Sequence, residues 1–279
     1  MPARIRVPAA LLHHNRSASS SGAVDNFLTA VIKYPFYPSS SAINNSLAQS
    51  LPDIPSLASV TKILEETRDP GHKRLLDQWK LKQIKELGSE EAFEKAQKQR
   101  LGVGSSLHVC IRQFFKGIPE EDISVQPDVA GYWRSILPTL RQMRDISNME
   151  AFVDHSALGY RGRLDAIGYY DNQQWLIDWK TSEKNKVDIK SVYDYPLQVA
   201  AYAGALNFQQ PDRPILRGLL LFCYKSGNEA TLHLMQQDEL KHYWNEFKIR
   251  LKDYYSNWLL DQSVEKSSRR AKKSVKSSS

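Results

Sequence analysis

The spacing of hydrophobic residues changes part-way along this chain. Up to about residue 145, apolar positions recur every three or four residues, which is the period of an amphipathic helix. Leu75, Leu76 and Trp79 share such a spacing, and we expect them to lie in the core. The pattern predicts helices over 56–67, over 71–98 with an interruption at Gly88, from an N-cap at Ser105 or Ser106 to Gly117, and over 128–145.

Beyond about residue 160 the chain alternates between strand and helix patterns. Two predicted strands, 160–170 and 173–179, flank the turn pair Asp171-Asn172 and should form a hairpin. A helix at 196–208, strands at 215–224 and 230–235 and a long helix at 237–260 follow. This order predicts an α/β or α+β fold, with one mixed sheet flanked by helices and an added N-terminal helical region.

Charge is distributed unevenly over the 279 residues. The net charge is +7, but residues 1–52 carry +3 and residues 262–279 carry +5, which leaves −1 on residues 53–261. The first 52 residues are basic, rich in serine and nearly free of acids, which is typical of a mitochondrial transit peptide followed by a flexible arm. We therefore predict a folded domain over 53–261 and a disordered basic tail over 262–279.

Several protein classes are excluded by the composition. No apolar run approaches the roughly 20 residues that a membrane-spanning helix needs, so no membrane insertion is expected. Two cysteines, Cys110 and Cys223, are too few for a disulfide framework or a four-thiolate metal site, and no disulfide partner is expected. Neither the nucleophile elbow of serine hydrolases nor the phosphate-binding loop of NTPases occurs in the sequence.

The predicted hairpin carries the candidate chemistry. Side chains alternate between the two faces of a strand, so Arg161, Arg163 and Asp165 share one face of the first strand, and Asp178 and Lys180 share one face of the second. Pairing of the strands would bring the two carboxylates and the ammonium together. Two close carboxylates favour a bound cation, and oxygen ligands suit Mg²⁺, with Mn²⁺ as a substitute. A structural ion pair in the hairpin is the alternative.

Such a cluster would suit phosphodiester hydrolysis. A bound metal lowers the pKa of a water molecule and stabilises negative charge on phosphate oxygens. The carbonyl of Trp179 could supply a further oxygen ligand. Lys180 would orient the water or stabilise the developing charge, and Arg161 and Arg163 would position the phosphate.

Two motifs here resemble a known family. The segments GRLDAIG at 162–168 and LIDWKT at 176–181 resemble the RecB-like branch of the PD-(D/E)xK nucleases, although Leu164 stands at the position of the proline. Longer stretches, SVTKILEET at 59–67, LIDWKTSEK at 176–184 and PLQVAAYAGALN at 196–207, resemble the mitochondrial genome maintenance exonucleases within that branch. Several motifs in the right order are more specific than any one of them.

The resemblance implies a restriction-endonuclease-like fold and a role for each matching residue. Asp165, Asp178 and Lys180 match the catalytic positions, with both aspartates as metal ligands, and His108 matches an accessory metal ligand. Gln198 and Tyr202 match a motif near DNA or the active site, for which helix packing is the alternative. Glu150 lies where related nucleases often carry an acid, and it could equally be a solvated surface residue.

By the same resemblance, the protein would be an Mg²⁺-dependent exonuclease of the mitochondrial matrix. It would act on single-stranded DNA with free ends, favour the 5′-to-3′ direction, and serve mitochondrial DNA maintenance, replication and repair. Nothing in the residues themselves gives the direction. A DNA-binding module without catalytic activity and an RNA-directed nuclease are the alternatives.

Overall fold

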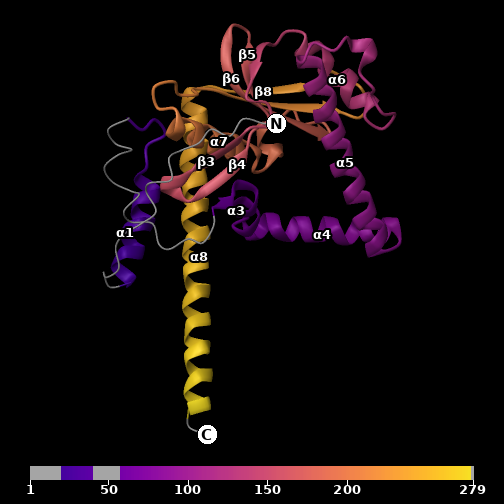
Figure 1. Cartoon of the computed structure of the whole chain (residues 1–279). Helices are drawn as coiled ribbons and strands as arrows, with labels where there is room; N and C mark the ends of the chain where they lie inside the picture. Colours follow the sequence, from indigo (N-terminus) through magenta and orange to yellow (C-terminus); the bar gives the residue numbers. More distant parts are fainter. Residues whose placement is uncertain (1–19, 40–56, 278–279) are drawn as a thin grey trace.

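The computed structural model describes residues 20–39 and 57–277, and it has an α+β architecture in which helices flank two sheets (Figure 1). In the larger sheet, neighbouring strands are antiparallel except for β6 and β7, which are parallel. Its order is β2 (Arg144–Ser147), β5 (Ala166–Tyr170), β6 (Gln173–Ser182), β7 (Gly218–Tyr224) and β8 (Thr231–Met235). The predicted fold class is confirmed.

A second, three-stranded sheet was not expected. It has the order β1 (Ala58–Ser59), β4 (Tyr160–Arg163) and β3 (Phe152–His155). The prediction of one strand over 160–170 in one sheet is therefore wrong, because the chain leaves the smaller sheet after Arg163 and enters the larger one at Ala166. At the crossing, the Leu164 N–H donates to the Ala151 carbonyl, and the Asp165 carbonyl accepts from the Glu150 N–H.

The central strand β6 faces a different helical layer on each side. Leu176 belongs to a core with α3 (Val60–Glu66), α7 (Tyr195–Gln209) and α8 (Gln237–Ser277). Ile177 and Trp179 belong to the opposite core, with α5 (Glu90–Phe115) and α6 (Ala130–Leu140). Because successive side chains point to opposite faces, Asp178 and Lys180 lie on the α7 side of the sheet.

One continuous helix, α5, covers both the part of the predicted helix 71–98 that follows Gly88 and the separate helix predicted to begin at Ser105 or Ser106. The preceding helix α4 (Pro70–Leu87) ends at Gly88, whose φ of 90° is left-handed. Ser89 then caps α5, and its side chain accepts from the Ala92 N–H. The predicted helix start at Ser105 or Ser106 is wrong, because the Ser105 hydroxyl donates to the Leu101 carbonyl inside the continuous helix.

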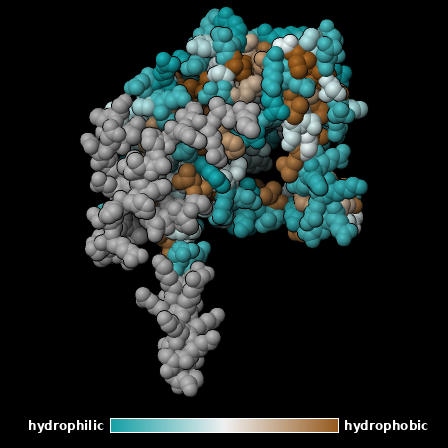
Figure 2. Space-filling model, in the orientation of Figure 1, coloured by the Kyte–Doolittle hydropathy of each residue, from teal (hydrophilic) through white to brown (hydrophobic). Residues whose placement is uncertain are grey.

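The expectation that Trp79 lies in the core is also wrong. None of the residues of α4 is buried; Leu75 is 61% exposed and Trp79 is 36% exposed. The Trp79 ring meets the edge of Phe93 on α5 and the guanidinium of Arg100. Figure 2 shows hydrophobic surface, in brown, on the side of the molecule that carries α4 and α5. The helical period identified the helix but not the partner that covers its apolar face.

Other helix ends differ from those predicted. The helix expected over 128–145 ends at Leu140, because Arg144 pairs with Tyr169 in the larger sheet. At the other end of the chain, α8 continues to Ser277, through most of the segment where a disordered tail was expected. None of the described helices has the length and apolar character of a membrane span. Cys110 and Cys223 are buried free thiols.

The helix α1 (Ser20–Lys33) belongs to the folded core. Phe27 and Val31 are fully buried, as is nearly all of Phe36, and they pack in the same core as α7 and α8. The Lys248 ammonium on α8 donates to the carbonyls of Ile32, at 2.7 Å, and Tyr34, at 2.8 Å. The flexible arm predicted over 1–52 is therefore wrong for residues 20–39, while residues 1–19 and 40–56 lie outside the described part.

A buried histidine makes the stability of this core sensitive to acid. His155 is fully buried, stacks on Phe208 at 4.3 Å between ring centroids, and has neither ring nitrogen hydrogen-bonded within the described residues. Burial lowers its pKa to about 3. Between that value and its ordinary pKa, the unfolded chain binds a proton that the folded chain does not. The free energy of unfolding should therefore fall as the pH falls below about 6.5.

His155→Phe should remove this dependence. Relative to the variant, the wild type should lose up to about 1.4 kcal/mol of unfolding free energy per pH unit below about pH 6.5. Urea denaturation at a series of pH values measures the difference. His242→Phe, at an exposed position on α8, is the control. Parallel pH curves for the wild type and His155→Phe would contradict the prediction.

Candidate active site

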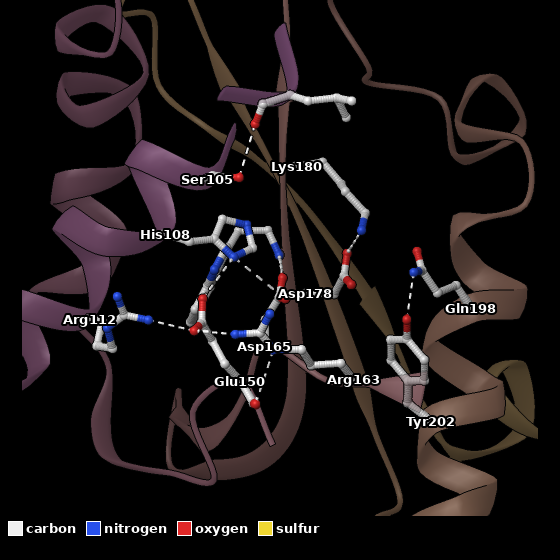
Figure 3. Close-up of polar contacts among 12 residues, drawn as sticks. Ser105, His108, Arg112, Glu150, Arg163, Asp165, Asp178, Lys180, Gln198 and Tyr202 are labelled. Atoms are coloured by element: carbon white, nitrogen blue, oxygen red, sulfur yellow. Dashed lines mark hydrogen bonds and ion pairs between the residues drawn. The ribbon is translucent and has the colours of Figure 1, made fainter. Parts of the chain in front are cut away.

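Asp165, Asp178 and Lys180 lie together where the two sheets separate (Figure 3). Asp165 sits between β4 and β5, and its Oδ2 accepts from the backbone N–H of Trp179 on β6 at 3.0 Å. Asp178 is 1% exposed, and its Oδ2 lies 2.8 Å from the Lys180 Nζ. This contact is an ion pair, and Asp178 Oδ2 has no well-directed hydrogen bond within the described residues. The strand register thus assembles the cluster.

Burial and mutual repulsion change the protonation of this cluster. Burial, and then repulsion by the Asp178 carboxylate, raise the pKa of Asp165 to about 8, although Lys180 and the Trp179 N–H act in the opposite direction. Burial lowers the pKa of Lys180, but the Asp178 and Asp165 carboxylates more than offset this, so the pKa lies above its usual value. At neutral pH, Asp165 therefore holds a proton that a nearby cation would displace.

Glu150 connects the cluster to two arginines. Its φ of 51° is left-handed, and its backbone N–H donates to the Asp165 carbonyl at 2.7 Å. Its Oε2 accepts from Arg112 Nη1 at 2.5 Å and from Arg163 Nη2 at 2.6 Å, and Figure 3 shows the two guanidinium groups reaching it from different sides. Glu150 is thus part of the site rather than a solvated surface residue.

His108 lies on α5 between two acids. Its Nδ1 is 3.7 Å from Asp165 Oδ1 and 3.8 Å from Glu150 Oε1. Burial lowers the pKa of His108, and the Asp178 carboxylate acts in the opposite direction without reversing the change. The ring is therefore neutral near pH 7, and a neutral imidazole can act as a metal ligand or a proton acceptor.

Gln198 and Tyr202 contact each other on α7. The Gln198 amide donates to the Tyr202 hydroxyl at 2.7 Å, and both residues are buried. The Tyr202 ring fills the space beside Gly162 on β4, where an added Cβ would come within 2.2 Å of Cε1. Burial raises the pKa of Tyr202 to about 12, so its hydroxyl keeps its proton. The pair packs helix against sheet next to the cluster.

One predicted site residue stays outside the cluster, and two unpredicted residues join it. Arg161 is exposed on β4, and its side chain makes no hydrogen bond or ion pair with any residue that the structure describes. Arg112 was missed, although it follows His108 by four residues and so shares its helix face. Tyr195 was also missed; its ring centroid lies 4.9 Å from Lys180 Nζ. No signal in the sequence linked Tyr195 to Lys180.

The donor chemistry of the cluster fits a hard divalent cation. Carboxylates of Asp165, Asp178 and Glu150 and the His108 imidazole are suitable ligands for Mg²⁺ or Mn²⁺. The raised pKa of Asp165 beside the Asp178 carboxylate is the feature that a cation would relieve. As they stand, Asp178 is paired with Lys180 and Glu150 with two arginines. No three acidic, histidine or cysteine side chains in the described ranges are grouped as a metal-ligand set.

Comparison with known proteins identifies related sequences. No protein-family model matches the chain. It is 34% identical to mitochondrial genome maintenance exonuclease 1 of Mus musculus over 202 residues and 33% identical to that of Homo sapiens over 202 residues. It is 32% identical to that of Xenopus tropicalis over 200 residues. The resemblance to mitochondrial genome maintenance exonucleases is confirmed.

The similarity covers only part of these relatives. Each alignment spans 71% of this chain and 57–59% of the relative, so the chain spans less than two thirds of the length of the curated proteins it matches. A solved structure titled SSO0001 aligns over 83% of this chain and 86% of its own, with 14% sequence identity. Its TM-score of 0.32 is too low to support any argument about fold.

Proposed function

We propose that this chain is a metal-dependent exonuclease that hydrolyses phosphodiester bonds of single-stranded DNA. The observation that carries the proposal is the close group of buried Asp178 with the partly buried Asp165 and Lys180, in which the Asp165 carboxyl has a raised pKa of about 8 beside a second carboxylate. Burying two acids and an ammonium together is costly for a protein that only needs a stable hairpin. A role in phosphodiester hydrolysis would explain why these charged side chains are placed together despite that cost.

Asp165 and Asp178 would hold Mg²⁺ or Mn²⁺, with His108 as an accessory ligand. When bound, the metal would supply an acidified water and stabilise charge on the phosphate. Lys180 keeps its proton, because its pKa is raised, and so presents a positive charge to the attacking water or the developing phosphorane. Arg112 and Arg163 are held by Glu150 beside the cluster, where they can bind phosphate oxygens.

The cellular role is proposed from the names of the relatives. They support maintenance of the mitochondrial genome and a location in the mitochondrion, while a role in replication and repair rests on the family resemblance. The matrix, the transit peptide, the requirement for a free end and the 5′-to-3′ preference rest on the family resemblance. Because Phe27 and Val31 are buried in the core, removal of a transit peptide should occur before them.

Removing the metal should abolish cleavage of single-stranded DNA. An oligonucleotide labelled at its 5′ or its 3′ end would be incubated with the full chain in Mg²⁺, in Mn²⁺ or in EDTA. We expect products with either metal and none in EDTA, because two buried carboxylates without a cation cannot generate the nucleophile. The order in which the two labels are released gives the direction.

Matched substrates separate the alternatives. A circular single strand should resist cleavage if a free end is required, and an RNA strand of the same sequence tests the RNA-directed alternative. Cleavage that is undiminished in EDTA would contradict the metal assignment. Binding of DNA by a folded protein without cleavage in either metal would favour the non-catalytic module.

A further inference from the structure

Two aromatic side chains near the cluster are unusually exposed. Phe152, on β3, is 62% exposed, and Tyr193, just before α7, is 65% exposed. The other exposed aromatic side chains in the described ranges, those of Tyr195, Trp79 and Tyr169, are only 36–38% exposed. Both Phe152 and Tyr193 leave most of a ring in water although a folded core lies beside them.

Phe152 lies on the Glu150 side of the cluster. It pairs in register with Arg163 on β4, and the Arg163 guanidinium carbon is 5.8 Å from its ring centroid. The same guanidinium donates to Glu150 Oε2 at 2.6 Å. Arg163 therefore contacts both the exposed Phe152 ring and Glu150. The backbone N–H of Glu150 in turn donates to the Asp165 carbonyl.

Tyr193 lies on the Lys180 side. It precedes Tyr195 by two residues, and the Tyr195 ring centroid is 4.9 Å from Lys180 Nζ. The Lys186 ammonium lies 5.2 Å from the Tyr193 ring centroid, and the His72 ring of α4 meets Tyr193 edge-on at 5.9 Å. Each exposed ring thus has a cation beside it.

The backbone that presents Tyr193 is held in an uncommon conformation. Its φ of 55° lies in the left-handed region, which few residues other than glycine adopt. The adjacent Asp194 forms an ion pair with Arg250 of α8 at 3.0 Å, and Arg250 also donates to the Leu64 carbonyl of α3 at 2.5 Å. Arg250 therefore links this segment to α8 and α3, and strain of this kind is concentrated at functional positions.

We propose that Phe152 and Tyr193 are stacking platforms for nucleobases of single-stranded DNA, one on each side of the catalytic cluster. An exposed ring with an adjacent cation offers a flat face to a base and a positive charge to its phosphate, which is how proteins bind single strands without sequence preference. A strand that stacks on both rings crosses the cluster between them. This inference rests on the proposed function and adds the residues that guide the substrate.

The test compares strands that have bases with strands that lack them. Fluorescence anisotropy in EDTA measures binding of a labelled oligonucleotide without cleavage. Phe152→Leu and Tyr193→Leu should each raise the Kd by about 5-fold to about 100-fold. Phe152→Trp should retain wild-type affinity, and Tyr169→Leu, near the hairpin turn of β5 and β6, should not change it. On a strand of abasic residues, the two leucine variants should bind like the wild type.

The outcomes distinguish this inference from the proposed function. Leucine variants with the wild-type Kd, or with equal losses on normal and abasic strands, would overturn the stacking role even if the wild type cleaves DNA. A wild type that binds in a base-dependent way but never cleaves would overturn the catalytic function and leave the stacking role intact. Failure of the folded wild type both to bind single-stranded DNA and to cleave it in Mg²⁺ or Mn²⁺ would overturn both.

Discussion

Replacing Lys180 by alanine should lower kcat/KM for DNA cleavage by between about 100-fold and about 10,000-fold. Lys180 Nζ lies 2.8 Å from Asp178 Oδ2, and its raised pKa keeps it charged over the pH range in which an enzyme of this kind would work. Without it, the attacking water and the phosphate lose the fixed positive charge that the chain itself supplies. End-labelled single-stranded DNA in Mg²⁺ provides the measurement.

Loss of folding has to be separated from loss of chemistry. Lys180→Ala leaves Asp178 buried without its partner, which lowers the free energy of unfolding as well. The double variant Asp178→Asn/Lys180→Met keeps the size of both side chains and removes both charges, so it should fold and remain inactive. Lys82→Ala, in an exposed ion pair on α4, is the matched control and should keep full activity. Wild-type activity in the double variant would contradict the catalytic assignment.

Phe27→Ala should destabilise the folded chain by about 3–5 kcal/mol, the range found when a buried phenylalanine is truncated. Phe27 is fully buried and meets the ring of Tyr255 on α8 edge-on at 5.3 Å. The loss combines the apolar surface that returns to water with the cavity left between α1 and α8. Urea denaturation, followed by circular dichroism, measures the change.

A second residue of the same helix provides the control. Ile32 is 38% exposed, and Ile32→Ala should change the free energy of unfolding by about 0.5 kcal/mol or less. If Phe27→Ala costs no more than Ile32→Ala, α1 is not part of the core, and residues 20–39 could be removed with a transit peptide. The expected large difference would instead place the start of the folded domain before Phe27.

The positions of the candidate catalytic residues could be predicted from local pattern. Alternation along β6 correctly placed Leu176, Asp178 and Lys180 on one face and Ile177 and Trp179 on the other, because the period of two is a property of the extended backbone itself. The helix at 196–208 was predicted nearly to its observed ends, and its four-residue spacing puts Gln198 beside Tyr202. These features depend on neighbours in the sequence.

The predictions that were wrong concern contacts between distant segments. The helical period in α4 could not show whether another element covers Trp79, because burial depends on a partner elsewhere in the chain. The basic, serine-rich composition of the first 52 residues matched a flexible arm, yet α1 packs on α8 more than 200 residues away. The composition of a segment does not show which distant segment it packs against.

The sequence by itself determined the α+β class, the three candidate catalytic residues, and the resemblance to mitochondrial genome maintenance exonucleases. Tertiary structure alone decided that the chain changes sheets at Asp165, and that Glu150 holds Arg112 and Arg163 beside His108. It also decided that Phe152 and Tyr193 stay exposed. The physical reason is that periodicity and motifs are local, while burial, raised pKa values and ion pairs arise only where remote segments exclude water together.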